Sequence, residues 1–447
     1  MTSGRVPAPS PAGRVAVPPS LHALIAEVEG RLAHRPRLAA MFGPCIRNAL
    51  DTTVTTCPDG TAFVATGDIP AMWIRDSAAQ VRPYLVLAAG GDETMADLIE
   101  AVIRRQCAFL RLDPYANAFN AVPGPPGNPV DRPLPHPLVW ERKFELDSGC
   151  WPLLLAHDLW RATGRTAHVD DRFEAAARAI LETWRVEQDH EARSGYRFHR
   201  PGAPAIDRLG RDGRGPRVAP TGMVWSGFRP SDDATTHGYL VPANLLATVA
   251  LAALADLADA VARPSLAVEA RGLRAEIAAG LEAHAVVPLS DGGTAWAYEV
   301  DGMGGVLLAD DANLPSLLAL PWLGVCAPDD QHYRATRAIV LSDANPWFAR
   351  GHVAHGIGSP HTPRGWVWHL ALITQALTAT DPAEREAVLD MLERTDAGTG
   401  LMHESFDPDD PRHFTRPWFG WANALLAELL LLETGLGEVL RRDVPAP

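Results

Sequence analysis

The sequence predicts an all-α fold, an (α/α)6 barrel, from three observations. Helical patterns dominate the 447 residues, with apolar positions recurring at the i, i+3 and i+4 spacing of an amphipathic helix. Strand patterns are few and short. Six segments rich in Gly, Pro, Trp, Asp and His separate the helical patterns, and each segment lies just before one of them. Six helical hairpins with long loops would use most of the chain as a toroid of about twelve helices.

The individual elements follow from apolar periodicity and from helix-end signals. The periodicity predicts helices over residues 96–112, 151–163, 172–188, 245–262, 265–284, 366–379, 383–395 and 420–437. Asp381 followed by Pro382 marks a helix start, because proline is tolerated at the first helical position. Gly435 and Gly437 are candidates to end the last helix. Residues 217–228 and 295–302 are expected to form minor β-ribbons at the rim.

Only the N-terminus departs from this composition. Residues 1–20 are rich in Pro and Ala and contain no apolar run, so we expect a disordered tail rather than a secretion signal. Residues 21–447 are expected to form a single catalytic domain. The most apolar stretch, residues 245–262, contains Asp256 and Asp259 and is therefore interpreted as a buried helix, not as a membrane span.

Charge and cysteine content exclude several classes of partner. The formal net charge of -14 disfavours nucleic acids and anionic membranes, which both require a basic surface. The five cysteines are scattered and form no CxxC pair, which indicates reduced thiols in a cytoplasmic protein. His352, His355 and His361 lack the spacing of zinc ligands on a helix. We therefore expect no metal and no other cofactor; the oligomeric state stays open.

The six polar and aromatic segments are the candidate site. They hold more than half of the thirteen tryptophans together with many carboxylates. Sugar rings stack on indole, and their hydroxyls bind Asp, Arg, Asn and His, so this mixture indicates a carbohydrate site on a rigid helical scaffold. The segments begin at Thr66, Trp140, Gly222, Ala297, His355 and Gly400.

Two of these segments carry candidate catalytic carboxylates. Glycoside cleavage needs one carboxyl group as general acid and another as general base or nucleophile. Asp232 and Asp233 in "GFRPSDDATTHGYL" are candidates for the acid, and Glu404 in "MHESF" is the candidate for the other group. Arg229 would keep one aspartate ionised while the pKa of the other is raised.

Alternative interpretations remain for the segment and for the protein. Ser231 or one of the aspartates could simply cap a helix that begins near Ala234. The whole chain could be an inverting glycosidase acting on another α-linked sugar, or a non-catalytic sugar-binding protein. A binding protein would need no acid and base pair.

At these segments the chain resembles glycoside hydrolase family 125. The resemblance rests on "TGDIPAMWIRDSAAQVRPYL", "FELDSGCWPLLLA", "WSGFRPSDDATTHGYLVPAN", "YEVDGMGGVLLADDANLPSLL", "GIGSPHT" and "GLMHESFDPDDPRHFTRPWFGWAN", and spans roughly residues 21–440. It implies an (α/α)6 barrel with metal-independent, inverting exo-α-1,6-mannosidase activity. The implied substrate is a small mannosyl oligosaccharide or glycan.

The resemblance also implies roles for individual residues. The family's general acid falls on Asp232, with Asp233 as the alternative, and its general base falls on Glu404. An inverting mechanism predicts a separation of about 6.5–9.5 Å between the two carboxyl groups. The expected substrate-binding residues are Trp73, Arg75, Asp76, Glu145, Asp147, Arg229, Asp233, His237, Asp301, Asn313, His361 and Trp418.

Overall fold

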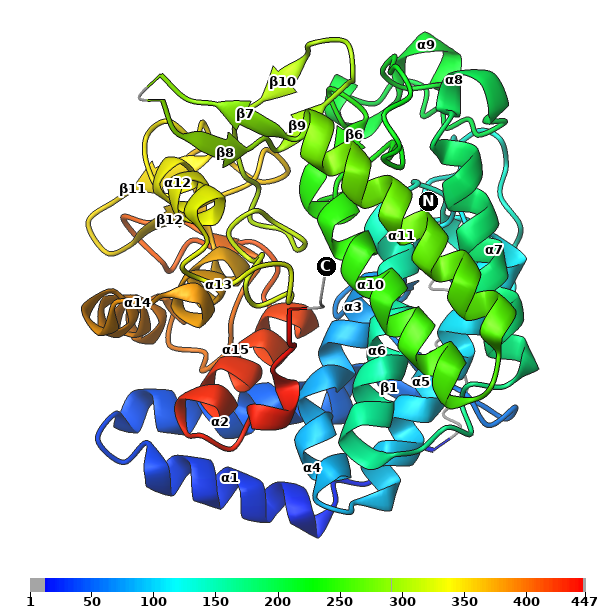
Figure 1. Ribbon diagram of the computed structural model, residues 1–447. Coiled ribbons are helices and arrows are strands. Elements are labelled where there is room, and N and C mark those ends of the chain that lie inside the picture. Colours follow the sequence, from blue (N-terminus) through cyan, green and yellow to red (C-terminus); the bar gives the residue numbers. More distant parts are fainter. Residues whose placement is uncertain (1–12, 291, 445–447) are drawn as a thin grey trace, which may run out of the picture.

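Helices form most of the structure, a computed structural model that describes residues 13–290 and 292–444 (Figure 1). The long helices are α1 (Pro19–Arg31), α2 (Pro36–Asn48), α3 (Ile74–Val81), α5 (Glu93–Leu112), α6 (Leu146–Thr163), α7 (Asp171–Glu187), α10 (Val241–Ala260), α11 (Pro264–His284), α12 (Gln331–Val340), α13 (His369–Thr378), α14 (Pro382–Thr395) and α15 (Gly420–Glu433). Short helices are α4 (Leu85–Ala89), α8 (His190–Arg193) and α9 (Gly210–Gly213). The helices predicted from periodicity are thus confirmed.

Most of the long helices pack against each other as neighbouring pairs. Helix α6 contacts both α3 and α10, and α15 contacts α13, α3 and α2. Helices α5, α11 and α14 pack against α6, α10 and α13 respectively. In Figure 1, α15 (red) lies next to the N-terminal helices in blue, so the last helix closes the arrangement begun by the first ones.

Four helices of the described chain begin with a side-chain cap, and others do not. Asp92, Asp170, Asp330 and Asp381 cap α5, α7, α12 and α14 by accepting hydrogen bonds from first-turn amides. Helices α3, α6, α10, α13 and α15 have no such side-chain cap. Instead, short strands lead directly into α3, α10 and α13. We call α3, α6, α10, α13 and α15 the inner helices; three of them begin directly after a short strand instead of at a capped turn.

The strands are two or three residues long and all their pairings are antiparallel. They are β1 (Val54–Thr56) with β2 (Ala62–Val64); β3 (Met72–Trp73), β4 (Ala118–Phe119) and β5 (Val139–Glu141); β6 (Tyr239–Leu240), β9 (Glu299–Val300) and β10 (Val306–Leu307); β7 (Val286–Pro288) with β8 (Thr294–Trp296); β11 (Phe348–Arg350) with β12 (His355–Ile357); and β13 (Val367–Trp368) with β14 (Ser405–Phe406). The ribbon predicted at residues 295–302 is confirmed by β8 and β9. The ribbon predicted at residues 217–228 is wrong, because Pro220 and Gly222 (φ 90°) interrupt the extended run.

One part of the ring is irregular. Between α10 and α12, residues 311–330 form bends and turns rather than the long helix that the hairpin pattern implies. Leu317, Leu318 and Leu320 are nevertheless buried. Pro315 and Pro321 explain the difference, because proline removes a helical hydrogen bond and clashes with the preceding turn. The chain fills this position with packed apolar turns.

The structure also corrects the boundary of the N-terminal tail. Residues 1–12 lie outside the described residues. The carbonyl of Gly13 accepts a hydrogen bond from Thr56 Oγ1 (2.7 Å), and α1 begins at Pro19. The predicted boundary after residue 20 therefore falls inside structured chain.

Helix ends and the apolar stretch behave largely as expected. Asp381 accepts the amide of Ala383 with Pro382 in the first turn. After α15, Gly435 adopts φ 70°, which suits a helix C-terminus, whereas Gly437 does not. Within the described residues, α10 is the one helix long and apolar enough to cross a membrane, and 83% of that stretch is buried in the protein. It is the core helix predicted from residues 245–262. All five cysteines are free thiols.

A buried ion cluster fastens the inner helices at the end of α3. Arg82 contacts Glu428 on α15 and donates from Nε to Asp158 on α6 at 3.1 Å. We expect Arg82→Ala to lower the free energy of unfolding by about 3–5 kcal/mol, because it strands buried carboxylates. Chemical denaturation measures the loss. Arg271→Ala, which removes an exposed ion pair with Asp259, should leave the midpoint unchanged.

The same cluster predicts acid sensitivity. Burial raises the pKa of Asp158, but Arg442 and Arg82 outweigh burial and lower it to about 2. A depressed pKa in the folded state stabilises the protein above the ordinary aspartate pKa of about 4, and this stabilisation is lost as the pH falls towards 2.

Candidate active site

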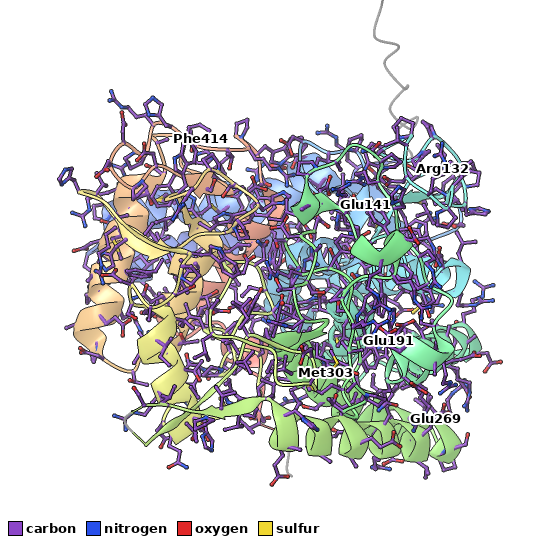
Figure 2. All side chains as sticks on the ribbon, turned by 90° about the horizontal axis from the view of Figure 1, so that it is seen from above. Arg132, Glu141, Glu191, Glu269, Met303 and Phe414 are labelled. Carbon is purple, nitrogen blue, oxygen red and sulfur yellow. The ribbon has the colours of Figure 1, made fainter. Side chains whose placement is uncertain are left out.

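A cavity of about 180 Å³ opens where the inner helices begin. Trp73, Trp368 and Phe419 are the residues immediately before α3, α13 and α15. Phe414 and Arg132, from two rim loops, lie on the opposite side of the molecule from Glu269 of α11 (Figure 2). The cavity is lined by Thr66, Ile69, Trp73, Arg75, Asp76, Pro230, Ser231, Asp232, Asn313, His361, Trp368, Glu404, Arg416, Phe419 and Trp421.

Asp232 is held in the cavity wall by a constrained turn. Its φ of 65° lies in the left-handed region, which is unfavourable for a residue other than glycine. Lys143 Nζ donates to the carbonyl of Asp232 at 2.7 Å and fixes this backbone. The Asp232 carboxylate accepts hydrogen bonds from Trp73 Nε1 (3.2 Å) and Asn117 Nδ2 (2.8 Å). A strained backbone secured from both sides is typical of a functional position.

A second carboxyl group lies directly behind Asp232. The carboxyl groups of Glu145 and Asp232 both lie within hydrogen-bond distance of Asn117 Nδ2, at 3.2 and 2.8 Å, and Glu145 Oε2 accepts from Arg75 at 2.7 Å. Burial opposes ionisation of Asp232, but Lys143, the adjacent Glu145 carboxyl group and Arg75 lower its pKa to about 2. Burial, with the nearby Asp232 charge, raises the pKa of Glu145 well above its usual range. Of these two carboxyl groups, Glu145 is therefore the one whose ionisation is disfavoured.

Glu404 reaches the cavity from a different segment. It directly precedes β14, which pairs with β13 so that Ser405 lies opposite Trp368. The amide of Met402 donates to Asn423 Oδ1 of α15 at 2.8 Å, which fixes the other side of Glu404. Arg416 NH1 lies 3.6 Å from Glu404 Oε1. Glu404 and Asp232 are thus brought to one cavity by loops distant in sequence.

Two further titratable groups line the cavity. Burial raises the pKa of Asp76 to about 6, although Arg75 and Arg416 oppose the shift. Burial lowers the pKa of His361, but its hydrogen bond to Asp233 (3.1 Å) outweighs burial. The nearby charges add to this effect, and the pKa rises to about 9. His361 is therefore a cation at neutral pH.

The remaining wall suits a polar ring with apolar faces. Trp73, Trp368 and Phe419 contribute aromatic surface. Among the described residues, Trp421 Nε1 and Arg75 Nε are buried without a hydrogen-bond partner, so both donors are available to a ligand. In the described ranges, no group of three or more His, Cys, Asp or Glu side chains is arranged to hold a metal ion. Paired carboxylates, aromatic faces and free donors together fit a sugar ring.

Comparisons with known proteins agree with a sugar-binding cavity. A family model described as metal-independent alpha-mannosidase (GH125) matches residues 35–431. The chain belongs to glycoside hydrolase family 125. A Streptococcus pneumoniae member of a family of metal-independent alpha mannosidases has been solved in a non-productive complex with alpha-1,6-mannobiose. It is 43% identical, with a TM-score of 0.92 over 94% of this chain and 99% of that chain.

Two other known proteins are also similar to this chain. The Meiotically up-regulated gene 157 protein of Schizosaccharomyces pombe is 39% identical to the GH125 chain, covering 88% of it and 82% of the yeast protein. A bacterial glucoamylase complexed with acarbose shares the fold alone, at 13% identity and a TM-score of 0.56 over 90% of this chain and 56% of that chain.

Half of the site residues predicted for this GH125 protein line the cavity. The structure places Trp73, Arg75, Asp76, Asp232, Asn313, His361 and Glu404 there. Asn313 belongs to the irregular turn region. Its backbone N–H donates a hydrogen bond to Asp311 Oδ1 (3.1 Å).

The interpretation of the two aspartates needs correction. No helix begins near Ala234; the chain there bends and turns, and the next helix, α10, begins at Val241, so neither Ser231 nor Asp232 nor Asp233 caps a helix. Arg229 pairs with Glu299 at 2.6 Å instead of with either aspartate. The cations that lower the pKa of Asp232 are Lys143 first, then Arg75 and His361.

Asp233 lies behind the cavity wall. It is buried, does not line the cavity, and binds His361 Nδ1 and Ser231 Oγ (3.2 Å). Its direct contact with a sugar is therefore not supported, and its role is to hold the imidazole. The structure thus separates the two aspartates: one faces the cavity and the other faces a neighbouring side chain.

Five further predicted contacts also lie outside the cavity lining. Glu145 and Asp147 have fully buried side chains bonded to Arg75, so they support the wall instead of facing a sugar. Asp301 accepts the amides of its own Gly-rich turn at 2.7 and 2.8 Å and lies 3.6 Å from His237. Trp418 donates to Asn48. Because α15 begins at Gly420, the wall takes Phe419 and Trp421 instead.

Sequence reasoning missed several residues of the site. Asn117 and Lys143 were not predicted, although both bind Asp232. Arg416 and Trp368 line the cavity beside Glu404. A single Asn or Lys in a loop carries no periodic signal. The segments "RPWFGWAN" and "GWVWH" did signal an aromatic site, but not which ring faces inwards.

Replacing His361 by Gln should weaken sugar binding in this GH125 protein. Loss of a charged donor predicts about a 10- to 100-fold rise in KM, with a smaller change in kcat. In the unmodified protein KM should rise as the pH passes about 9, where the imidazolium loses its proton. The Gln variant should lack that rise. Steady-state kinetics from pH 5 to pH 10 measure both effects, and an unchanged KM would contradict a contact between His361 and the sugar.

Proposed function

We propose that the protein is an inverting exo-α-1,6-mannosidase built on an (α/α)6 barrel. The observation that carries the proposal is the meeting of Asp232 and Glu404 in one cavity lined by aromatic rings. Family membership supports α-mannoside hydrolysis. The complex of the pneumococcal relative with alpha-1,6-mannobiose supports the linkage. A cavity of about 180 Å³ suits one terminal sugar ring, in keeping with exo action.

In the proposed mechanism Asp232 is the general acid. Its proton goes to the glycosidic oxygen as the bond to the anomeric carbon breaks. Asp232 is favoured over Asp233 because only Asp232 lines the cavity.

Glu404 is the proposed general base. It removes a proton from a water molecule, whose oxygen bonds to the opposite face of the anomeric carbon. The proton gained by Glu404 returns through solvent to restore the acid. Trp73, Trp368 and Phe419 would pack on the ring, and His361, Arg75 and Asn313 would bind its hydroxyls.

A substrate panel tests the specificity. We expect hydrolysis of α-1,6-mannobiose with full activity in the presence of EDTA, and little or no hydrolysis of α-1,2- or α-1,3-mannobiose or of α-glucosides. Preferred hydrolysis of an α-glucoside would favour the alternative of a glycosidase for another sugar. Binding of mannobiose with no turnover of any substrate would favour a sugar-binding protein.

A further inference from the structure

The carboxyl group behind Asp232 is too buried to bind a sugar and too constrained to be an ordinary core residue. The Glu145 side chain has no exposed surface, and it lies at the start of α6 without capping the helix. It accepts a hydrogen bond from Arg75 at 2.7 Å and shares the donor Asn117 Nδ2 with Asp232. A buried carboxylate is costly unless it is paired, so this placement needs an explanation.

Asn117 shows how the carboxyl groups are held together. Its Oδ1 accepts the backbone amide of Lys143 at 3.1 Å, which fixes the orientation of the amide group. Its Nδ2 must therefore face three carboxyl groups at once: Asp232 at 2.8 Å, Glu141 at 3.1 Å and Glu145 at 3.2 Å. An amide nitrogen has two hydrogens, so it cannot satisfy three carboxylates.

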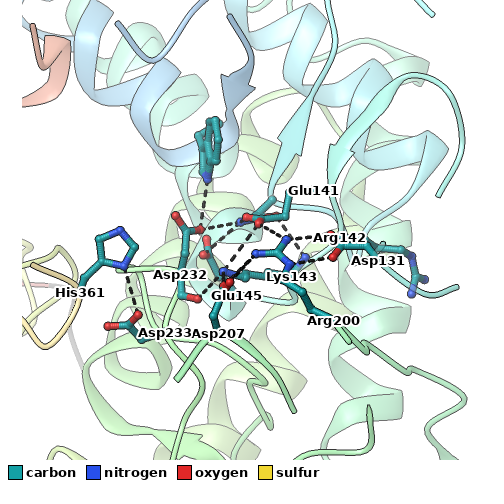
Figure 3. Close-up of polar contacts among 12 residues, drawn as sticks. Asp131, Glu141, Arg142, Lys143, Glu145, Arg200, Asp207, Asp232, Asp233 and His361 are labelled. Carbon is teal, nitrogen blue, oxygen red and sulfur yellow. Dashed lines mark hydrogen bonds and ion pairs between the residues drawn. The ribbon is translucent and has the colours of Figure 1, made fainter. Parts of the chain in front are cut away.

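The cations around these carboxyl groups each contact more than one acceptor. Arg75 NH1 serves both Glu145 and Asp147, at 2.7 and 3.1 Å, and its Nε lies 3.7 Å from Asp76. On the other side, Lys143 serves Asp207 (2.6 Å) as well as the carbonyl of Asp232 (Figure 3). With more carboxyl groups than cations, the cluster retains at least one proton at neutral pH. The charged groups around Glu145 and Asp232 are Arg75, Asp76, Glu141, Lys143, Asp147, Arg200, Asp207, His361 and Glu404.

We propose that Glu145 is a positioning residue that shares one proton with Asp232 and so keeps the general acid supplied with its proton. We call the carboxyl groups of Glu145 and Asp232 the acid pair. This inference rests on the proposed function and adds a residue to it. The acid pair begins the reaction with one proton and a net charge of −1. That proton moves through Asp232 to the glycosidic oxygen, and the pair is left with a charge of −2 until solvent returns a proton.

The acid pair explains how a carboxyl group beside Lys143 and Arg75 can act as an acid near neutral pH. A lone Asp232 beside two cations would lose its proton readily. The second carboxyl group makes loss of the last proton unfavourable, because two adjacent negative charges would result. The proton is therefore kept until bond cleavage withdraws it.

Glu145→Gln tests the proposal, because glutamine keeps the shape but cannot share a proton. The basic limb of kcat/KM for α-1,6-mannobiose should move to lower pH by about one unit or more. Activity at pH 7 should fall at least about tenfold and recover on acidification. Hydrolysis of 2,4-dinitrophenyl α-mannoside, whose leaving group needs no protonation, should be much less affected.

Asp147→Asn is the matched control. Asp147 is equally buried and shares Arg75, but its carboxylate accepts from Trp151 and does not share Asn117 with Asp232, so the basic limb of this variant should move far less than that of Glu145→Gln. If Glu145→Gln reduces turnover of both substrates equally and leaves the basic limb in place, Glu145 has only a structural role. Asp232→Asn in the same assays separates the two ideas: normal mannobiose turnover there contradicts the proposed function itself.

The unmodified protein provides a measurement that does not depend on a folded variant. Its basic limb should lie above about pH 6, outside the range of a lone carboxyl group. A basic limb near pH 4 would contradict proton sharing.

Discussion

Replacing Glu404 by Gln is expected to remove nearly all turnover while leaving sugar binding intact. The amide cannot take a proton from the attacking water, so kcat for α-1,6-mannobiose should fall by about 10²- to 10⁴-fold. Glutamine has the same size and retains an oxygen facing Arg416, so the cavity keeps its shape. Product formation measures kcat, and calorimetry with mannobiose measures binding.

A carboxyl group on the same loop provides the control. Asp409 is exposed and accepts the amide of His352 outside the cavity, so Asp409→Asn should retain normal turnover. Turnover by Glu404→Gln within tenfold of the unmodified protein would exclude Glu404 as the base. Loss of mannobiose binding in that variant would instead indicate that Glu404 mainly binds the substrate.

Replacing Asp232 by Asn is expected to produce the second large effect, and one that depends on the leaving group. Mannobiose requires protonation of its leaving oxygen, so kcat should fall by about 10²- to 10⁴-fold. Dinitrophenyl α-mannoside should lose far less activity. The amide oxygen of the substituted side chain can still accept from Trp73 and Asn117, so the turn around it is preserved.

Asp233→Asn is the comparison that decides between the adjacent aspartates. Asp233 binds His361 and does not line the cavity. Its replacement should raise KM for both substrates by weakening the hold on the imidazole, with no dependence on the leaving group. If leaving-group dependence appears in Asp233→Asn and not in Asp232→Asn, the general acid is Asp233.

The helical scaffold was predictable because apolar periodicity is a local signal. Helices such as α7 and α11 were predicted within a residue of their bounds. The exceptions have local causes in prolines that interrupt a regular element, as with Pro315 and Pro321 in the turn region and with Pro220 in the supposed ribbon.

The site was only partly predictable because it depends on which way each side chain faces. The catalytic candidates Asp232 and Glu404 were found through residue chemistry and family resemblance. Asp233 and Trp418, each next in sequence to a residue that lines the cavity, were also expected to line it. A shift of one residue along the chain turns the side chain away from the cavity, and both side chains bind other residues instead. Partners such as Asn117 come from loops far apart in sequence, and only the packed helices bring them together.

These contacts also give a structural reason for the different functions that we propose for carboxyl groups of the same chemistry. Asp232 is open to the cavity and is held by Trp73 and Lys143. Glu145, one layer behind, is closed to solvent and shares Arg75 with Asp147. Exposure to the cavity separates a proton donor from the groups that set its pKa.

The stereochemical course of mannobiose hydrolysis tests the central claim most directly. A proton NMR time course on α-1,6-mannobiose reports substrate, linkage and anomeric outcome together. If Asp232 acts as acid and Glu404 activates water on the opposite face, β-mannose must appear first and then mutarotate to the equilibrium mixture. Initial release of α-mannose, or an intact disaccharide after prolonged incubation, would contradict an inverting exo-α-1,6-mannosidase.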